Sequence, residues 1–88
     1  MTSRPSRSPE LEIRDAAGDV LVHDPVRRKV HVLNPAAGRV LALCDGTRSR
    51  DDIAQALSAA TNADLAAVRR DVDAILLEFT ALQLLVTP

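Results

Sequence analysis

Hydrophobic and polar residues alternate along the first third of the chain, which is the period-two pattern of strands with one buried face. Three short strands are predicted, over residues 10–14, 20–22 and 29–33. A turn is expected between the first two, because Gly18 can adopt a positive φ. Pro25 is expected to end the second strand, because proline donates no ladder hydrogen bond. The short connections favour an antiparallel meander.

After residue 33 the hydrophobic spacing changes to three and four residues, the period of amphipathic helices. Three helices are predicted, each starting at a residue whose side chain can cap the first turn: Asn34, Ser49 and Asp64. Asp45-Gly46 is expected to end the first of them. The last helix is the most regular, and its apolar positions share one face: Leu65, Val68, Val72, Ile75, Phe79 and Leu82.

The predicted order is three strands followed by three helices (βββααα), an α+β fold. A three-stranded sheet must cover its apolar face, and the helices are the available cover. Residues 10–88 are predicted to form one domain. Residues 1–9 are rich in Ser, Arg and Pro and have no periodicity, so a disordered tail is predicted there.

Composition narrows the class of protein. Of the 88 residues, 47% are hydrophobic and 1% aromatic, so the core must consist of aliphatic side chains. A net charge of −1 argues against a nucleic-acid partner, because a basic excess supplies most non-specific affinity. A single cysteine, Cys44, fits a reducing compartment, and we expect a cytoplasmic protein. The longest apolar run, Val40–Cys44, is far shorter than the ~20 residues of a membrane span, and no signal peptide is visible.

Candidate catalytic and metal-binding residues are few. Cys44 could act as a nucleophile with His23 or His31 as base, but it lies in an apolar run, where small buried cysteines are common. These residues also lack the C-x-x-C or H-x-x-x-H spacing of metal sites. Asp51 and Asp52 are explained by the favourable position of acids in the first turn of a helix. We therefore expect no enzyme activity, no metal and no cofactor.

Three passages resemble the PqqD family, the free-standing form of the RiPP recognition element. This is a winged-helix-like domain of ribosomal peptide natural-product pathways. The resemblance covers roughly residues 11–86. Two positions depart from the family pattern: Val40 replaces a common aromatic, and Gln83 stands where glycine is common. The resembling passages are His31-Val32-Leu33-Asn34-Pro35-Ala36-Ala37, Leu43-Cys44-Asp45-Gly46-Thr47-Arg48-Ser49 and Val68-Arg69-Arg70-Asp71-Val72.

The resemblance implies a function. Family members bind the leader segment of a precursor peptide as an extra strand on the free edge of the third strand, against the third helix. They deliver it to a modifying enzyme such as a radical-SAM enzyme, a protease or a cyclase. The expected partners of this chain are therefore a leader peptide and one such enzyme, with no nucleic acid and no membrane.

Elementary physics supports the edge as a binding site. In a meander of three, the third strand lies at an edge, and its unpaired N–H and C=O groups are a template for another strand. No proline interrupts this strand, which carries Val30 and Val32 on one face and Lys29 and His31 on the other. The predicted peptide-binding segment is Lys29, Val30, His31, Val32 and Leu33.

The third helix is expected to form the other wall. A stripe beside its core face contains Arg69, Asp73, Leu76 and Thr80. Leu76 offers an apolar anchor, while Arg69 and Asp73 offer charges that set register and the choice of partner.

Two alternative functions are weighed against peptide binding. The second and third helices could form the helix-turn-helix of a DNA-binding winged helix, although Asp64, Asp71 and Asp73 would repel phosphate. The chain could also be a structural subunit of a larger enzyme complex that binds no peptide. An exposed edge is compatible with a monomer or a strand-paired dimer.

Overall fold

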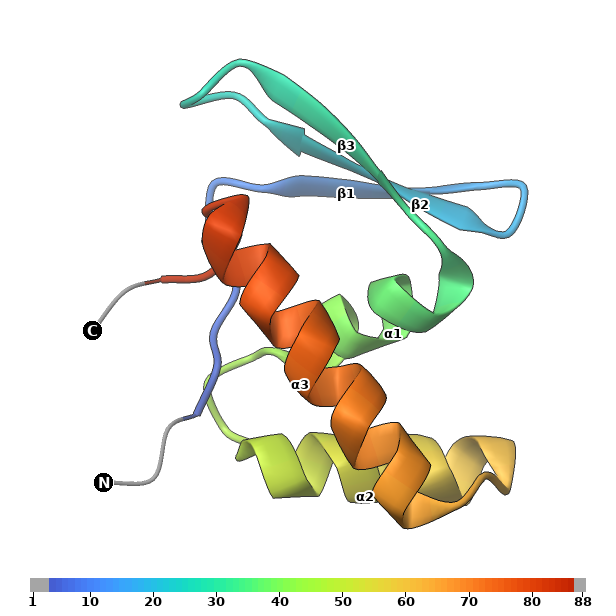
Figure 1. Cartoon of the computed structure of the whole chain (residues 1–88). Helices are drawn as coiled ribbons and strands as arrows, with labels where there is room; N and C mark the ends of the chain where they lie inside the picture. Colours follow the sequence, from blue (N-terminus) through green and yellow to red (C-terminus); the bar gives the residue numbers. More distant parts are fainter. Residues whose placement is uncertain (1–3, 87–88) are drawn as a thin grey trace.

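The computed structural model describes residues 4–86 and has the predicted order of elements. A sheet lies at one end of the molecule and α2 at the other, and α3 crosses the space between them (Figure 1). The βββααα, α+β fold expected from the pattern is confirmed. The elements are β1 (Glu12–Ala16), β2 (Asp19–Asp24), β3 (Lys29–Leu33), α1 (Pro35–Leu43), α2 (Arg50–Thr61) and α3 (Leu65–Ala81).

The three strands form an antiparallel meander in the order β1-β2-β3. β1 starts two residues later than predicted and continues through Asp15 and Ala16, which were expected in the turn. The turn needs only Ala17 and Gly18, both at positive φ (53° and 95°), and such two-residue turns match the twist of the strands. β3 occupies the predicted residues.

All three predicted caps are present. The Asn34 side chain accepts from the Ala37 N–H at 2.8 Å, and the Asp64 side chain accepts from the Ala67 N–H at 3.2 Å. Ser49 and Asp52 form a reciprocal capping box, in which each side chain accepts from the other residue's backbone N–H. None of the helices in the described part of the chain is long and apolar enough to cross a bilayer.

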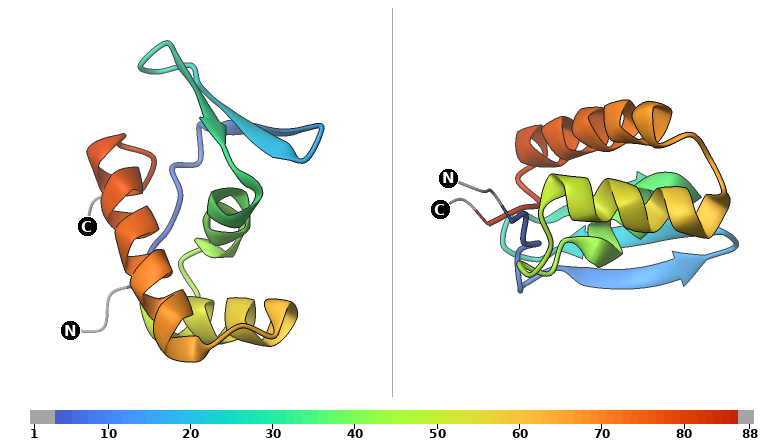
Figure 2. Two further views of the ribbon diagram at one scale, coloured as in Figure 1. Left: turned by 45° about the vertical axis from the view of Figure 1, so that its right-hand side comes forward. Right: turned by 90° about the horizontal axis from the view of Figure 1, so that it is seen from below.

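The core lies where the sheet, α1 and the two longer helices meet, and two further views show how the helices stack beneath the sheet (Figure 2). From α3 the core receives three residues of the predicted stripe, Val68, Val72 and Phe79, together with Leu76. The other three residues of the stripe, Leu65, Ile75 and Leu82, are only partly buried at the margin of the core. The buried residues are Val22, Leu33, Val40, Leu41, Cys44, Ile53, Ala54, Val68, Val72, Leu76, Phe79 and Leu84.

The N-terminal segment differs from the prediction of a disordered tail over 1–9. Residues 1–3 lie outside the described part, but the Arg7 N–H donates to the Cys44 carbonyl at 2.8 Å and the Ser8 N–H to the Leu84 carbonyl at 2.9 Å. The Arg7 guanidinium also donates to carbonyls at the end of α1, which no further helical turn satisfies. Backbone pairing of this kind requires no hydrophobic periodicity, so the pattern could not reveal it.

α1 packs against β2 through a glycine. A methyl group placed on Gly38 would overlap a methyl of Val20 and lie 3.1 Å from its Cβ. We predict that Gly38→Ala lowers the free energy of unfolding by roughly 1–3 kcal/mol through overpacking, partly offset by the higher helix propensity of alanine. Urea denaturation measures the change.

A second substitution isolates the cause. In the Gly38→Ala, Val20→Ala double variant the new methyl occupies the vacated space, so the two changes should cost less together than the sum of the single changes. Simple additivity would show that the Gly38–Val20 contact is not the source of the loss.

Candidate functional site

The outer edge of β3 is open. β3 pairs with β2 along its length, from Val20↔Leu33 to Asp24↔Lys29, and within residues 4–86 no strand pairs with its other edge. Every second residue of β3 therefore directs a backbone N–H and C=O outward. These groups form a template that an extended chain can complete.

The two faces of β3 differ in burial. Leu33 is buried and His31 half-buried, so this face is the one turned toward the helices. Val30 and Val32 lie on the opposite face with 63% and 65% exposure. The predicted alternation is therefore correct, and the core takes the face of His31 and Leu33. The His31 Nε2 is buried, with no hydrogen-bond partner among the described residues.

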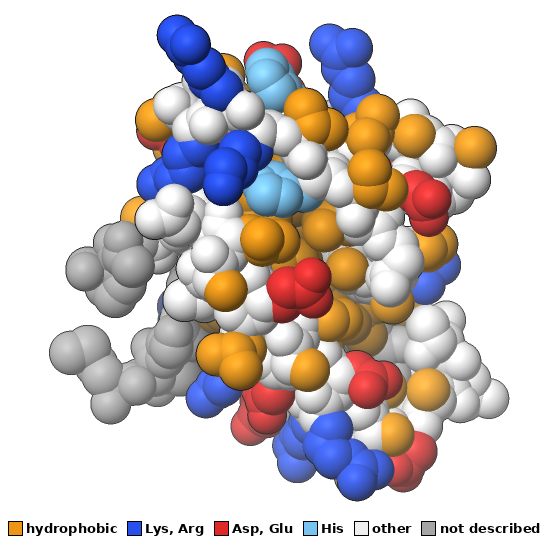
Figure 3. Space-filling model, turned by 45° about the horizontal axis from the view of Figure 1, so that its top comes forward, with side chains coloured by type: hydrophobic (Ala, Val, Ile, Leu, Met, Phe, Trp, Pro, Cys, Tyr) orange, Lys and Arg blue, Asp and Glu red, His pale blue; other side chains and the backbone are white. Residues whose placement is uncertain are grey.

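α3 runs along the side of the molecule on which β3 forms the edge of the sheet, and β1 lies on the far side (Figure 2). Among the described residues, no Cα of α3 lies within 8 Å of a Cα in the sheet. The space-filling view shows a hollow with hydrophobic side chains between the sheet and the helices, and basic side chains above it (Figure 3). We call this hollow the β3–α3 groove.

The β2–β3 turn is tied to the end of α3, and this tie sets one end of the groove. The Asp24 side chain is buried. It accepts hydrogen bonds from the backbone N–H groups of Val26 and Arg27, each at 3.1 Å. The Arg27 guanidinium bonds to Asp24 at 3.2 Å and to the Gln83 side chain at 2.7 Å. Burial raises the pKa of Asp24, but these hydrogen bonds and the Arg27 charge outweigh it and lower the pKa overall.

Gln83 follows Leu82, the C-cap of α3, and has a positive φ of 61°. Glycine adopts this conformation most easily after a helix. The residue that departs from the family pattern therefore takes the glycine-like conformation and adds a hydrogen bond to the turn.

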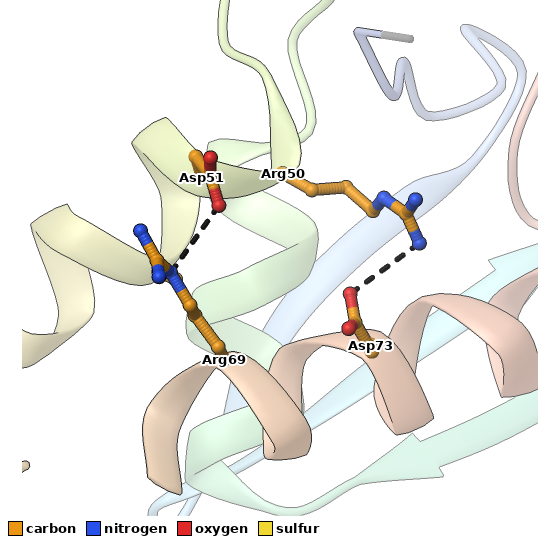
Figure 4. Close-up of a pocket in the computed structure, with 5 residues that line it drawn as sticks. Arg50, Asp51, Arg69 and Asp73 are labelled. Carbon is orange, nitrogen blue, oxygen red and sulfur yellow. Dashed lines mark hydrogen bonds and ion pairs between the residues drawn. The ribbon is translucent and has the colours of Figure 1, made fainter. Parts of the chain in front are cut away.

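The predicted residues of α3 do not gather at the groove. Arg69 pairs with Asp51 at 3.3 Å and Asp73 with Arg50 at 3.4 Å, and both pairs join α3 to the first turn of α2. They border a pocket of about 120 Å³ between these helices (Figure 4). Leu76 is 5% exposed and belongs to the core.

Helical spacing identifies the side chains on the other flank of α3. Residues four and seven positions apart share a flank. Asp71, Ile75, Glu78 and Leu82 follow this spacing on the flank away from Arg69 and Asp73; Ile75 and Leu82 are partly buried and the two acids exposed. The spacing of apolar residues predicted Ile75 as part of the core stripe, and it lies at the margin of the core on this flank.

Cys44 is fully buried, and burial raises the pKa of its thiol to about 11. The thiol is therefore protonated near neutral pH and enclosed by the core, which does not suit a nucleophile. No group of three metal-ligating side chains occurs among residues 4–86.

We predict a loss of stability at alkaline pH that depends on Cys44. The unfolded thiol ionises near its ordinary value of 9.0 while the folded thiol stays protonated to about 11. Between these values the free energy of unfolding should fall, relative to Cys44→Ala, by up to about 1.4 kcal/mol per pH unit. Equal pH profiles for the two proteins in urea denaturation would contradict this.

The comparisons with known proteins agree with this geometry. The model of the family described as coenzyme PQQ synthesis protein D (PqqD) matches residues 19–85. The chain therefore belongs to the PqqD family, as its sequence motifs indicated. No curated protein matches the chain in sequence.

Two solved structures share the fold. One is TbiB1 in complex with the TbiA(beta) leader peptide, at 19% identity and a TM-score of 0.78, over 91% of this chain and 93% of that one. The other is a lasso peptide synthetase B1 complexed with the leader peptide, at 17% identity and a TM-score of 0.78, over 98% of this chain and 100% of that one.

Proposed function

We propose that this protein binds the leader segment of a ribosomally synthesised precursor peptide as a fourth strand on β3 and presents it to a modifying enzyme. The observation that carries the proposal is the unpaired edge of β3 beside the apolar flank of α3. The two structural relatives support it, because each is a complex with a leader peptide.

The energetics assign different roles to backbone and side chains. Each ladder hydrogen bond contributes about 0.5–1.5 kcal/mol net. Ordering each peptide residue costs about 1–2 kcal/mol. These contributions nearly cancel, so the ladder sets direction and register. Micromolar binding needs about −8 kcal/mol, and apolar anchors must supply it at roughly 1.5–3 kcal/mol for each buried large side chain.

The proposed site therefore combines the edge Lys29–Leu33 with apolar side chains of α3. Ile75 and Leu82 can contact the apolar side chains of the peptide, because they lie at the margin of the core and are only partly buried. Leu76 supports them from within the core. Arg69 and Asp73 contribute by holding α3 against α2.

The proposed role is binding and delivery without catalysis. The buried, protonated Cys44 offers no nucleophile at neutral pH. Chemistry on the precursor would then belong to a separate enzyme. Peptide modification by a protease, cyclase or radical-SAM enzyme fits a protein that supplies only the substrate.

An N-methyl scan of the peptide tests strand addition. The probe is a peptide selected on this protein from a phage-displayed library of random 12-residue sequences and then synthesised with one backbone nitrogen methylated at a time. We expect affinity to fall at every second residue, because alternate N–H groups of a strand point toward β3. Calorimetry measures the affinity, and the intervening residues are the matched controls.

A period-two pattern together with amide shifts in Lys29–Leu33 of the isotope-labelled protein supports the proposal. A flat scan, or shifts confined to β1 and α2, would show that the peptide does not add to β3.

A further inference from the structure

The outer face of the sheet becomes more hydrophobic from β1 toward β3. Cross-strand register defines two rows on this face, Glu12–His23–Val30 and Arg14–Leu21–Val32. In the first row Glu12 and His23 pair at 3.3 Å, and in both rows a charged residue lies on β1 while a valine lies on β3. The apolar end of each row therefore lies at the unpaired edge of β3.

A free edge strand is expected to have the opposite arrangement, with the charged side chains on β3 and the apolar ones away from the edge. Edge strands that stay free usually carry charged side chains, which discourage pairing with another chain. Val30 and Val32 instead expose 63% and 65% of their surface beside the unpaired backbone of β3. Their cross-strand neighbours on β2 are His23 and Leu21, and no strand of the described residues flanks them on the other side.

We propose that the leader peptide is read on both faces of the strand it adds, and that its outward-facing side chains pack on Val30 and Val32. This inference rests on the proposed function. A strand paired with β3 places alternate side chains on the outer face, with Cβ atoms roughly 4.5–5.5 Å from those of the valines. The partner positions are then β-branched or aromatic residues, which pair best with valine.

The proposal assigns specificity to two places. Inward-facing anchors enter the β3–α3 groove, and outward-facing residues extend the two apolar rows by one position each. A leader with polar outward-facing residues would keep its backbone hydrogen bonds to β3 and its apolar side chains in the β3–α3 groove. It would lose the cross-strand contacts with Val30 and Val32.

The test uses a peptide selected from a phage-displayed library of random 12-residue sequences and then synthesised. Val30→Thr and Val32→Thr keep the β-branched shape and replace one methyl by hydroxyl. Each should weaken binding by roughly 1.5- to 5-fold. Val26→Thr is the matched control, because Val26 is 65% exposed and lies in the β2–β3 turn. Its effect should be smaller.

Two further measurements complete the test. Intermolecular NOEs should connect the methyl groups of Val30 and Val32 to alternate peptide side chains. Replacing those peptide residues by serine should abolish the effect of the valine substitutions in a double-mutant cycle, which a general loss of stability would not do.

The outcomes separate the two proposals. If the peptide shifts the amides of β3 while Val30→Thr and Val32→Thr behave like Val26→Thr, the two-faced reading is overturned and strand addition stands. If no selected peptide shifts those amides, both are overturned. If the valine substitutions change only sedimentation of the free protein, the face serves a second copy of the chain, and the inference fails.

Discussion

The structure depends on one constraint: the backbone groups on the outer edge of β3 must find partners outside the folded chain. Water satisfies them in the free protein, and a strand would satisfy them in a complex. The hollow between the sheet and the helices offers apolar side chains against which such a strand could pack (Figure 3). The bonds of Arg27 to Asp24 and Gln83 hold the turn against the end of α3 and so set one end of the hollow.

Much of the fold was predictable, because its signals are local. The caps at Asn34, Ser49 and Asp64 start each helix, and period-two alternation marks β3. The differences arise where long-range pairing decides. β1 extends through Ala16 because the turn needs two residues only, and Arg7 and Ser8 are held by carbonyls from distant parts of the chain. Neither the added β1–β2 pairing nor the bonds of Arg7 and Ser8 leave a pattern in the nearby sequence.

The candidate site was only half predictable. An edge strand follows from the order of three strands, so Lys29–Leu33 could be proposed from the sequence. The flank of α3 that faces the groove could not, because residues on both sides of the core stripe have equivalent spacing. Arg69 and Asp73 lie on the flank toward α2, where Asp51 and Arg50 engage them, and Ile75 lies on the other. Only the packing of α2 against one flank of α3 shows which flank remains for the groove.

The N-terminal segment has a consequence for engineering. The Val86 N–H donates to the Ser6 carbonyl at 2.7 Å, so the described ends of the chain lie side by side. Domains with adjacent ends tolerate circular permutation. A short linker joining them, with new ends opened between the exposed residues Asn62 and Ala63 that follow α2, would yield a permuted domain that keeps β3 intact. Such a rearrangement would let a reporter be attached beside α2 instead of beside the original ends.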